Sequence, residues 1–290
     1  MTGILLVDKP AEWTSHDVVA KLRRPLGERR IGHSGTLDPM ATGLLVVFVG
    51  RATRGVEFAE THDKRYIAKL RLGTTTDTGD IWGNVLSQSA LKTEKADLEN
   101  ALKAFRGDFL QTPPMYSAIK QNGKKMYELA RAGLSVELPP RAVHIGRLDI
   151  IGFEDGDWVL DVCCSKGTYI RSLCHDIGEA IGCGGTLSGL RRIETGLFSI
   201  ENAVTPDQIV DAALIGDSER YLRPLDELFL NLPSITADSE QEQRLRNGAA
   251  YACETEVGCY RVYGGSGEFL MLGKVSNGKM KTIKSFFEVS

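Results

Sequence analysis

Long hydrophobic segments are missing from this chain of 290 residues. Its longest apolar run covers residues 44–49, whereas a helix that crosses a bilayer needs about 20 apolar residues. The N-terminus leads directly into the apolar residues 4–7, without the charged start of a secretory signal peptide. We therefore expect no membrane-spanning segment and a cytoplasmic location.

The usual cysteine patterns of metal sites are missing too. No two of the six cysteines have C-x-x-C spacing, and none stands beside paired histidines; they are Cys163, Cys164, Cys174, Cys183, Cys253 and Cys259. In a cytosolic protein this pattern predicts reduced thiols and no zinc site. The Gly-rich loop with which many nucleotide-binding proteins hold phosphate is also absent. These features favour a protein that uses neither a metal nor a cofactor.

An overall positive charge, the common sign of a nucleic-acid partner, is absent as well. The chain has 35 Lys and Arg against 38 Asp and Glu, a net charge of −3. Basic residues nevertheless outnumber acidic ones by twelve to eight in residues 1–72 and by six to two in 117–147, while 205–242 has two against nine. Two basic faces could therefore bind a polyanion, although the simpler interpretation of these counts is an ordinary solvated surface.

The remaining composition is that of a packed globular protein. Hydrophobic residues make up 42% and charged residues 25%, and the length allows one large or two unequal domains. Apolar periodicity predicts strands over 3–7, 44–49 and 66–72, a hairpin of 142–153 with 157–164, and helices over 15–26, 94–105, 168–181 and 205–214. Thr14 or Ser15, Thr93 and Gly182 are the expected helix caps. Because regular βαβ spacing is lacking, we expect an α+β fold with a mixed, largely antiparallel sheet and flanking helices.

The pattern changes near residues 228–235. Beyond this point short strands and glycine turns predominate, so we expect a large domain over 1–230 and a small β-rich module over 231–290. Four lysines near its end alternate with apolar residues; they are Lys274, Lys279, Lys281 and Lys284. A basic β-rich module of this size is suited to binding a phosphate backbone.

Residues 32–43 are the most unusual segment. Three glycines allow the backbone to approach another group closely, and Pro39 restricts Asp38 to an extended conformation. Asp38 is thus held on a stiff loop that runs into the apolar strand 44–49. By itself, however, Asp-Pro is a common turn.

Taken singly, the other candidate residues have common structural explanations. Arg171 lies in the first turns of a helix, after a Lys-Gly-Thr turn whose backbone N–H groups could face an anion. Tyr66 on an alternating strand is usually a half-buried core residue, and His33 a loop histidine. The segment 75–80 could be a simple Asx turn.

In combination, these segments resemble the TruB family of tRNA pseudouridine synthases, which isomerise uridine 55 in the T-loop of tRNA. The matching stretches occur in the family's order over roughly the first 200 residues: 3–10, 32–43, 64–66, 76–80, 116–120, 127–133, 164–171 and 190–192. Residues 235–290 resemble the family's PUA-like RNA-binding module only in position, in size and in their pattern of short strands and glycine turns. One departure is Thr36, where bacterial members usually have a small alanine.

The resemblance implies roles for individual residues. Asp38 becomes the catalytic aspartate, Tyr66 the aromatic residue that stacks on the target base and assists proton removal from C5, and Arg171 the ion-pair partner of Asp38. The RNA-binding residues would be His33, Lys9, Lys64, Asp77, Lys120, Arg131, Lys166 and Leu190. His33 would occupy space left by flipped bases, and Leu190 would form an apolar wall.

The implied chemistry agrees with the residues present. The isomerisation breaks the N1–C1′ bond and joins C5 to C1′ without redox change, so it requires no cofactor. A carboxylate near C1′ and C2′ must be ionised, and we expect Arg171 to lower the pKa of Asp38 by about 1 to 3 units. A glycosidase would need a second, proton-donating carboxylate, and no paired carboxylate motif stands out. Whether Asp38 forms an adduct or assists elimination to a glycal stays open.

Two alternatives have other mechanisms. The same basic surfaces could bind and refold tRNA without chemistry, as an RNA chaperone does. The chain could also work with a guide RNA and accessory proteins, as the dyskerin relatives do. The compact C-terminal module and the loop at 32–43 favour an enzyme that acts alone on tRNA, as a monomer without an obligatory protein partner.

Overall fold

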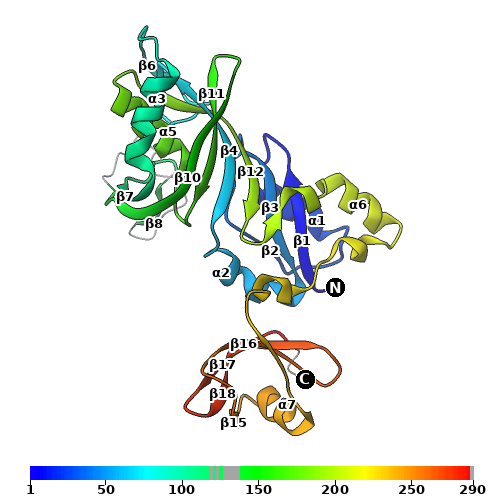
Figure 1. The fold of residues 1–290 in the computed structure, drawn as a ribbon. Coiled ribbons are helices and arrows are strands. Elements are labelled where there is room, and N and C mark those ends of the chain that lie inside the picture. Colours follow the sequence, from blue (N-terminus) through cyan, green and yellow to red (C-terminus); the bar gives the residue numbers. More distant parts are fainter. Residues whose placement is uncertain (118–119, 122–123, 127–137, 288–290) are drawn as a thin grey trace.

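The computed structural model describes residues 1–117, 120–121, 124–126 and 138–287. In the described part of the chain, nine strands form the main sheet (Figure 1). Seven of them follow the order β1 (Gly3–Lys9), β3 (Thr42–Val49), β12 (Gly185–Thr195), β4 (Lys64–Leu72), β11 (Asp157–Cys164), β10 (Arg141–Glu154) and β7 (Gly107–Gln111). The strands β2 (Ile31–Ser34) and β13 (Phe198–Ser199) pair with β3 and β12. Only β12 and β3 pair in parallel among these strands, which confirms the mixed, largely antiparallel sheet.

Helices pack on both halves of this sheet. The helices α3 (Lys95–Leu102) and α5 (Ile170–Ile181) lie against the half built from β4, β10 and β11, and they share its apolar core with Leu160 and Leu70 (Figure 1). The helices α1 (Ser15–Arg23) and α6 (Pro206–Leu214) lie against β1 and β3, around Leu5 and Val47. Shorter pieces are α2 (Val56–Ala59) and the 3₁₀ turns at Gly50–Gly55, Lys103–Phe105, Ile200–Asn202, Ser218–Tyr221 and Leu225–Phe229. Within the described ranges, no helix is long and apolar enough to cross a membrane.

The helix caps agree with the sequence in most places. Thr14 caps α1 with a capping box, and Gly182 ends α5 with a φ of 86°. The prediction that Thr93 caps the next helix is wrong: Glu94 is the N-cap of α3, and the Thr93 hydroxyl turns toward the Cys183 sulfur, 3.9 Å away. The first helix also ends at Arg23, three residues earlier than predicted.

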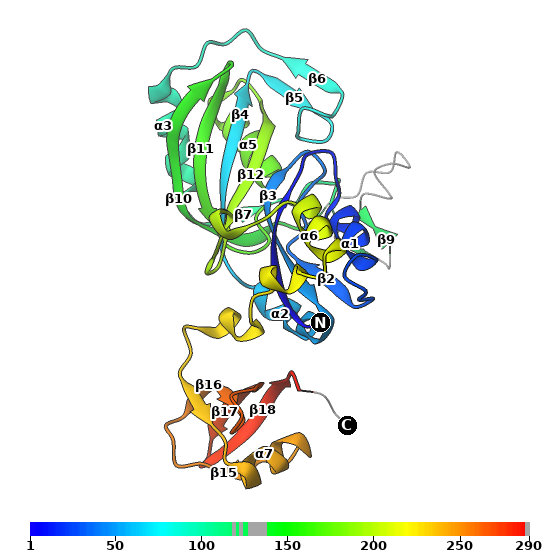
Figure 2. The same cartoon turned by 90° about the vertical axis from the view of Figure 1, so that its right-hand side faces the viewer.

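Hairpins extend from the main sheet. The predicted hairpin of β10 and β11 is present, with its tight turn at Asp155 and Gly156, both at positive φ. Two further pairs are β5 (Thr74–Thr76) with β6 (Val85–Gln88), and β8 (Lys120–Gln121) with β9 (Lys124–Lys125). In Figure 2, the β5–β6 hairpin lies at the upper right, above the end of the sheet that holds β3 and α1.

A second sheet builds the C-terminal module. Its strand order is β14 (Ser234–Thr236), β16 (Gly258–Tyr263), β17 (Phe269–Ser276), β18 (Lys279–Ser285) and β15 (Tyr251–Ala252), with α7 (Ser239–Arg246) beside it. Tyr251, Val262 and Met280 belong to its own apolar core. The module lies below the main sheet in Figures 1 and 2.

Aromatic side chains join the module to the main domain. Phe229 has its ring centroid 5.2 Å from that of Phe58, 6.0 Å from that of Phe269 and 6.1 Å from that of Phe286. At the edge of this contact, the Lys284 ammonium lies 2.6 Å from the Glu57 carboxylate. Because apolar and charged side chains contact across this boundary, the module packs against the main domain in addition to being connected to it by the chain.

Candidate active site

Asp38 lies on the loop between β2 and β3. Its neighbours Leu37 and Met40 are buried in the main core, and the Ser15 hydroxyl accepts a hydrogen bond of 2.9 Å from the Leu37 amide. The Ala41 amide donates to the Asp38 carbonyl at 3.0 Å. These contacts fix the loop on both sides of Asp38, whose carboxylate stays 38% exposed.

Arg171 meets this carboxylate from α5. Its Nε lies 3.0 Å from Asp38 Oδ2, which is the expected ion pair, and the residue is only 5% exposed. Its two other nitrogens donate to backbone carbonyls: Nη1 to Thr78 at 2.9 Å and Nη2 to Tyr116 at 2.7 Å. The guanidinium is therefore held in one orientation, and it presents a fixed positive charge to Asp38.

The end of β7 positions the start of α5. The Gln111 side chain exchanges two hydrogen bonds with the Tyr169 backbone, at 2.8 and 3.1 Å, and the Ser172 hydroxyl donates to the Thr112 carbonyl at 3.0 Å. Because Arg171 lies between Tyr169 and Ser172, these contacts fix its position along the helix axis. Sequence reasoning did not connect the 111–112 segment to the site, since the two are about 60 positions apart.

Asp80 is a second carboxylate at this guanidinium that the sequence-based site prediction missed. Its Oδ2 lies 3.9 Å from Arg171 Nη1, and its Oδ1 accepts from the Thr78 hydroxyl at 2.9 Å and the Trp82 amide at 3.1 Å. The sequence analysis named Asp77 from this segment, as an RNA-binding residue. Asp77 is exposed and accepts two hydrogen bonds from Asn84, both at 2.9 Å. The Thr and Asp residues of 76–80 mark this segment as a candidate site in the sequence, but they do not indicate which of the two carboxylates is buried.

The pKa of Asp38 is raised above its ordinary value. Burial is the largest cause, and the nearby charge of Asp80 adds to it, while Arg171 opposes both through its charge and its hydrogen bond. Although 38% of the side chain is exposed, most of its surroundings are protein. Arg171 acts in the expected direction, since it lowers the pKa of Asp38, but desolvation outweighs it and the pKa stays above its ordinary value.

Tyr66 lies on β4 beside another buried arginine. Its register partner on β12 is Arg192, which is 1% exposed and donates to the carbonyls of Leu44 at 2.7 Å and Gly35 at 2.9 Å. Burial raises the pKa of the Tyr66 phenol, and the charge and hydrogen bond of Arg192 oppose this. The charge of Asp38 also acts on the phenol, so the two groups share one electrostatic environment. Arg192 belongs to the matching stretch 190–192, but no role was predicted for it. The sequence pattern of β12 does not reveal that its side chain is buried.

Lys9 and Lys64 have positions that do not fit direct RNA contacts. Lys9 is completely buried, and its ammonium donates to the carbonyls of Pro10, Trp13 and Pro39 at 2.8, 2.6 and 3.4 Å. The Lys64 ammonium donates to the carbonyls of Glu60 and His62 at 2.8 and 2.5 Å. Burial lowers the pKa of each lysine to about 8. Both ammonium groups tie the backbone together, and Lys9 holds the segment that carries Asp38 through Pro39.

The other predicted RNA-binding residues are spread around the site. His33 lies on β2; its buried Nδ1 has no hydrogen-bond partner among the residues that the structure describes, and burial and Arg192 lower its pKa. Leu190 on β12 packs against the main core, and Lys166 is exposed in the turn before α5. Lys120 belongs to β8, while Arg131 lies outside the described residues.

Glycine is required at the end of the Asp38 loop. Gly43 has a φ of +99°, and a Cβ there would lie 2.3 Å from the Arg192 carbonyl oxygen. We expect Gly43→Ala to lower the free energy of unfolding by about 2–4 kcal/mol, because it strains the backbone and separates β3 from β12. Gly32→Ala is the matched control, since its Cβ would find the nearest atoms at 3.8 Å. Urea denaturation measures both, and equal losses in the two variants would contradict the requirement.

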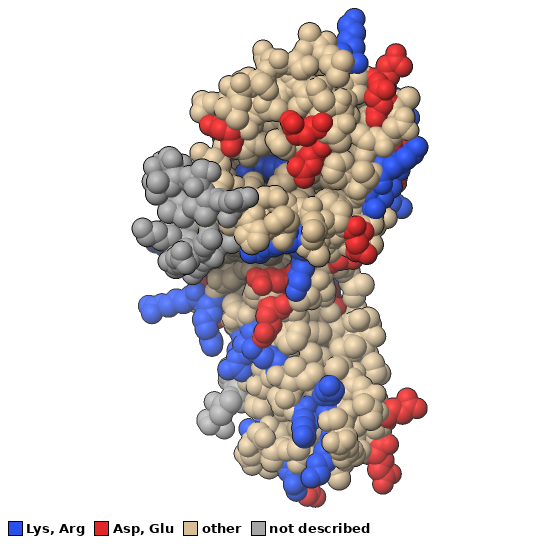
Figure 3. Space-filling model, turned by 90° about the vertical axis from the view of Figure 1, so that its left-hand side faces the viewer, with Lys and Arg blue, Asp and Glu red and all other residues tan. Residues whose placement is uncertain are grey.

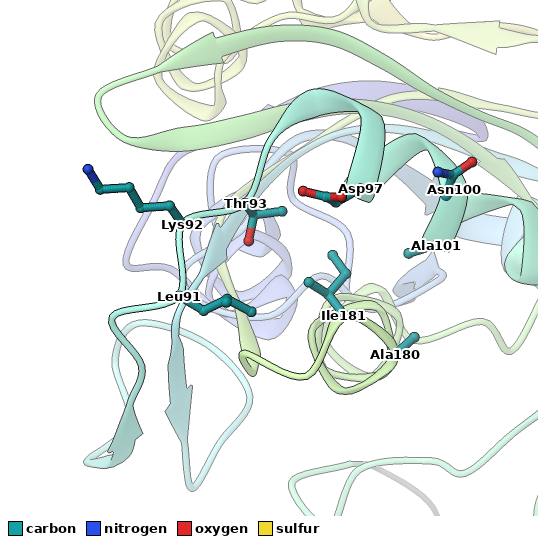
Figure 4. Close-up of a pocket in the computed structure, with 8 residues that line it drawn as sticks. All are labelled: Leu91, Lys92, Thr93, Asp97, Asn100, Ala101, Ala180 and Ile181. Atoms are coloured by element: carbon teal, nitrogen blue, oxygen red, sulfur yellow. The ribbon is translucent and has the colours of Figure 1, made fainter.

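A separate cavity lies away from this site. It has a volume of about 520 Å³ and is lined by Leu91, Lys92, Thr93, Asp97, Asn100, Ala101, Ala180 and Ile181 (Figure 4). Ala180 and Ile181 belong to the C-terminal end of α5, whereas Arg171 is near its start. In the described ranges, no cluster of three or more His, Cys, Asp or Glu side chains is arranged to hold a metal ion.

Basic side chains are distributed over the module as the sequence predicts. Lys274, Lys279 and Lys281 are exposed, while the intervening Met280 is buried. Figure 3 shows Lys and Arg side chains gathered on one face of this lower part of the molecule. This face could attract a phosphate backbone.

Family models match most of the chain. One described as "TruB family pseudouridylate synthase (N terminal domain)" matches residues 23–170, and one described as "tRNA pseudouridylate synthase B C-terminal domain" matches residues 171–232. Among curated relatives, a "tRNA pseudouridine synthase B" of Clostridium kluyveri is 38% identical, over 99% of this chain and all of the relative. A protein of the same name from Syntrophomonas wolfei is 42% identical, over 98% of this chain and 96% of the relative.

Solved structures show the same fold. A chain from the "Crystal Structure of a Cbf5-Nop10-Gar1 Complex" matches with a TM-score of 0.76 and 25% identity, over 99% of this chain and 85% of its own. A chain from the "Structure of H/ACA RNP bound to a substrate RNA containing 2'-deoxyuridine" matches with a TM-score of 0.75 and 23% identity, over 99% and 86%. The second likeness is one of fold alone.

Proposed function

The chain belongs to the TruB family of pseudouridine synthases, and from this we propose that it isomerises uridine 55 in the T-loop of tRNA. The observation that supports this activity most directly is the pair of Asp38 and Arg171, with Nε 3.0 Å from Oδ2 at an open carboxylate. A single carboxylate held in this way can attack the ribose or assist elimination once the base has been flipped out of its stack. The reaction then needs only rotation of the uracil ring and a new bond from C5 to C1′.

Each residue of the site has a proposed task. Asp38 acts at C1′ and C2′ as the ionised carboxylate, and Arg171 favours that ionised form against the effect of burial. Tyr66 lies against the uracil ring and assists removal of the C5 proton. Asp80 and Lys9 are positioning residues, because the first contacts Arg171 and the second contacts the Pro39 carbonyl beside Asp38.

RNA binding is proposed for a wider set of residues. Lys166 is exposed close to Arg171 in sequence, and the basic face of residues 231–290 suits the tRNA backbone as a PUA-like module. The remaining proposed contacts are His33, Asp77, Lys120, Arg131 and Leu190. Lys9 and Lys64 leave this set, because backbone carbonyls already occupy their ammonium groups.

We further propose that the chain acts alone, as a cytoplasmic monomer. The similarity to relatives named tRNA pseudouridine synthase B, over 98–99% of this chain, supports tRNA as the substrate. A guide-RNA-dependent enzyme is the second candidate, because the solved chains of similar fold come from complexes with other components. Turnover of an isolated T-loop hairpin by the purified chain would favour the first, and activity only with added guide RNA and proteins the second.

Tritium release provides the test of the reaction itself. tRNA transcribed with uridine labelled at C5 should lose tritium to water in the presence of the protein, and carbodiimide modification with primer extension should place pseudouridine at position 55. A protein that binds and refolds tRNA without releasing tritium would be an RNA chaperone. That result would contradict the proposal.

Tyr66→Phe tests the proposed role of the phenol in proton removal. The variant keeps the aromatic ring, so we expect tRNA affinity within a few-fold of wild type and slower formation of pseudouridine after the N1–C1′ bond has broken. Burial, which raises the phenol pKa, works against this role, and Arg192 supports it. Single-turnover measurements with C5-labelled RNA separate the two steps. Wild-type kinetics in this variant would remove Tyr66 from proton transfer and leave it as a stacking surface.

A further inference from the structure

Trp82 is an exposed aromatic side chain next to the proposed active site. It belongs to the turn between β5 and β6, and it is 54% exposed. A tryptophan is normally among the more deeply buried residues of a protein, so exposure of its large ring calls for an explanation. We propose that the Trp82 indole stacks on an unpaired base of the RNA substrate, beside the uridine that enters the cleft.

The turn that carries Trp82 is rigid. Asp80 Oδ1 accepts from the Trp82 amide at 3.1 Å, and the Asp80 carbonyl accepts from the Gly83 amide at 3.1 Å. The Ile81 amide donates to the Leu187 carbonyl of β12 at 3.0 Å. Close packing allows only glycine at position 83, where a Cβ would lie 2.3 Å from the Thr78 hydroxyl. The Trp82 backbone is thus ordered before any ligand binds, which lowers the entropic cost of stacking.

The same turn contacts the catalytic pair. The Thr78 carbonyl accepts from Arg171 Nη1, and the Asp80 carboxylate lies 3.9 Å from that nitrogen. Arg171 in turn holds Asp38 through Nε. Only Ile81 separates Asp80 from Trp82 in the chain, so the backbone that carries the indole is connected to the proposed catalytic pair through Asp80.

Base flipping creates the need for such a surface. When one nucleotide leaves a stacked loop, its neighbours lose a stacking partner, which costs a few kcal/mol. An exposed aromatic side chain near the flipped nucleotide can replace that partner whatever the base, because every base has a flat π-face. The inference therefore rests on the proposed RNA substrate and assigns to Trp82 a separate contribution to its binding.

The neighbouring apolar residues suggest a competing explanation. Ile81, Val85 and Leu86 are also exposed, so this hairpin could instead bind a second protein chain. Trp82 differs from these three because its backbone hydrogen-bonds to Asp80, which also contacts the catalytic arginine. This connection to the site favours RNA as the partner.

Binding measurements on four proteins test the proposal. In the Asp38→Asn background, which prevents turnover, affinity for a T-loop hairpin RNA is measured with Trp82, Trp82→Ala, Trp82→Phe and the control Leu86→Ala, whose side chain is 67% exposed on the same hairpin. We expect about tenfold weaker binding in Trp82→Ala and affinity within about threefold of the reference in Trp82→Phe and Leu86→Ala. Thermal unfolding should be alike in all four.

A spectroscopic experiment reports on the indole directly. With Trp13→Phe and Trp158→Phe present, Trp82 is the only tryptophan of the chain, and its fluorescence should be quenched as the hairpin is added. Unchanged affinity in Trp82→Ala, or no quenching, would overturn the proposal. A change of oligomeric state in place of RNA affinity would also overturn it and assign the hairpin to protein contacts. Tritium release by the wild-type protein is independent of these results, so loss of this inference would leave the proposed activity standing.

Discussion

Asp38→Asn should lower turnover by about 10³-fold or more, while affinity for tRNA stays within a few-fold of wild type. The amide has nearly the same shape, so it can accept from Arg171 Nε as the carboxylate does at 3.0 Å. It cannot attack C1′ or take a proton from C2′ as a carboxylate can. Single-turnover tritium release gives the rate, and filter binding gives the affinity.

The matched control changes another aspartate in the same way. The Asp108 side chain on β7 is 89% exposed and pairs with His144, away from the Asp38 contacts, so Asp108→Asn should turn over at the wild-type rate. Substantial tritium release by Asp38→Asn would show that another group carries the reaction. Loss of tRNA binding in that variant would instead show that the carboxylate is needed to shape the RNA site.

Removal of the guanidinium should have the second large effect. In Arg171→Met, Asp38 keeps the burial that raises its pKa and loses the charge that opposes it. The pH midpoint of kcat/KM should therefore move upward by about 1–3 units, and turnover at neutral pH should fall by about 10–10³-fold. Activity depends on the ionised carboxylate, so it is lost as the pH falls through that midpoint in both proteins.

The free energy of unfolding of Arg171→Met should change with pH in the direction opposite to its activity. A carboxyl group whose folded pKa lies above its unfolded value favours unfolding as the pH rises, because the unfolded chain releases the proton more easily. Removing Arg171 enlarges this difference, so the variant should lose stability relative to wild type as the pH is raised from 4 toward 8. Urea denaturation across this range measures the effect.

Arg171→Lys separates charge from hydrogen bonding. Lysine retains the positive charge but cannot reproduce three contacts at once, to Asp38, Thr78 and Tyr116. We expect its pH midpoint to stay close to that of wild type while kcat falls. An unshifted midpoint in Arg171→Met would mean that the charge of Arg171 does not govern the ionisation of Asp38.

The sequence by itself determined the local elements. Thr14, Gly182 and the turn at Asp155 and Gly156 act through hydrogen bonds and φ angles within a few residues, so their roles are legible in the chain. The pairing of Asp38 with Arg171 was predicted from a family resemblance. Taken from its own segment alone, each of the two residues has a common structural explanation: Asp38 in an Asp-Pro turn and Arg171 near the start of a helix.

Only the tertiary structure decided which charged groups face inward. Lys9 and Arg192 are fully or almost fully buried, and Asp80 instead of Asp77 contacts Arg171. Burial also outweighs Arg171 in setting the pKa of Asp38, which lies above its ordinary value. These outcomes depend on distances between β1, β4, β12 and α5, which are far apart in sequence. The free energy of a charge is set by the water it loses and the partners it gains, and both are defined only when those elements pack together.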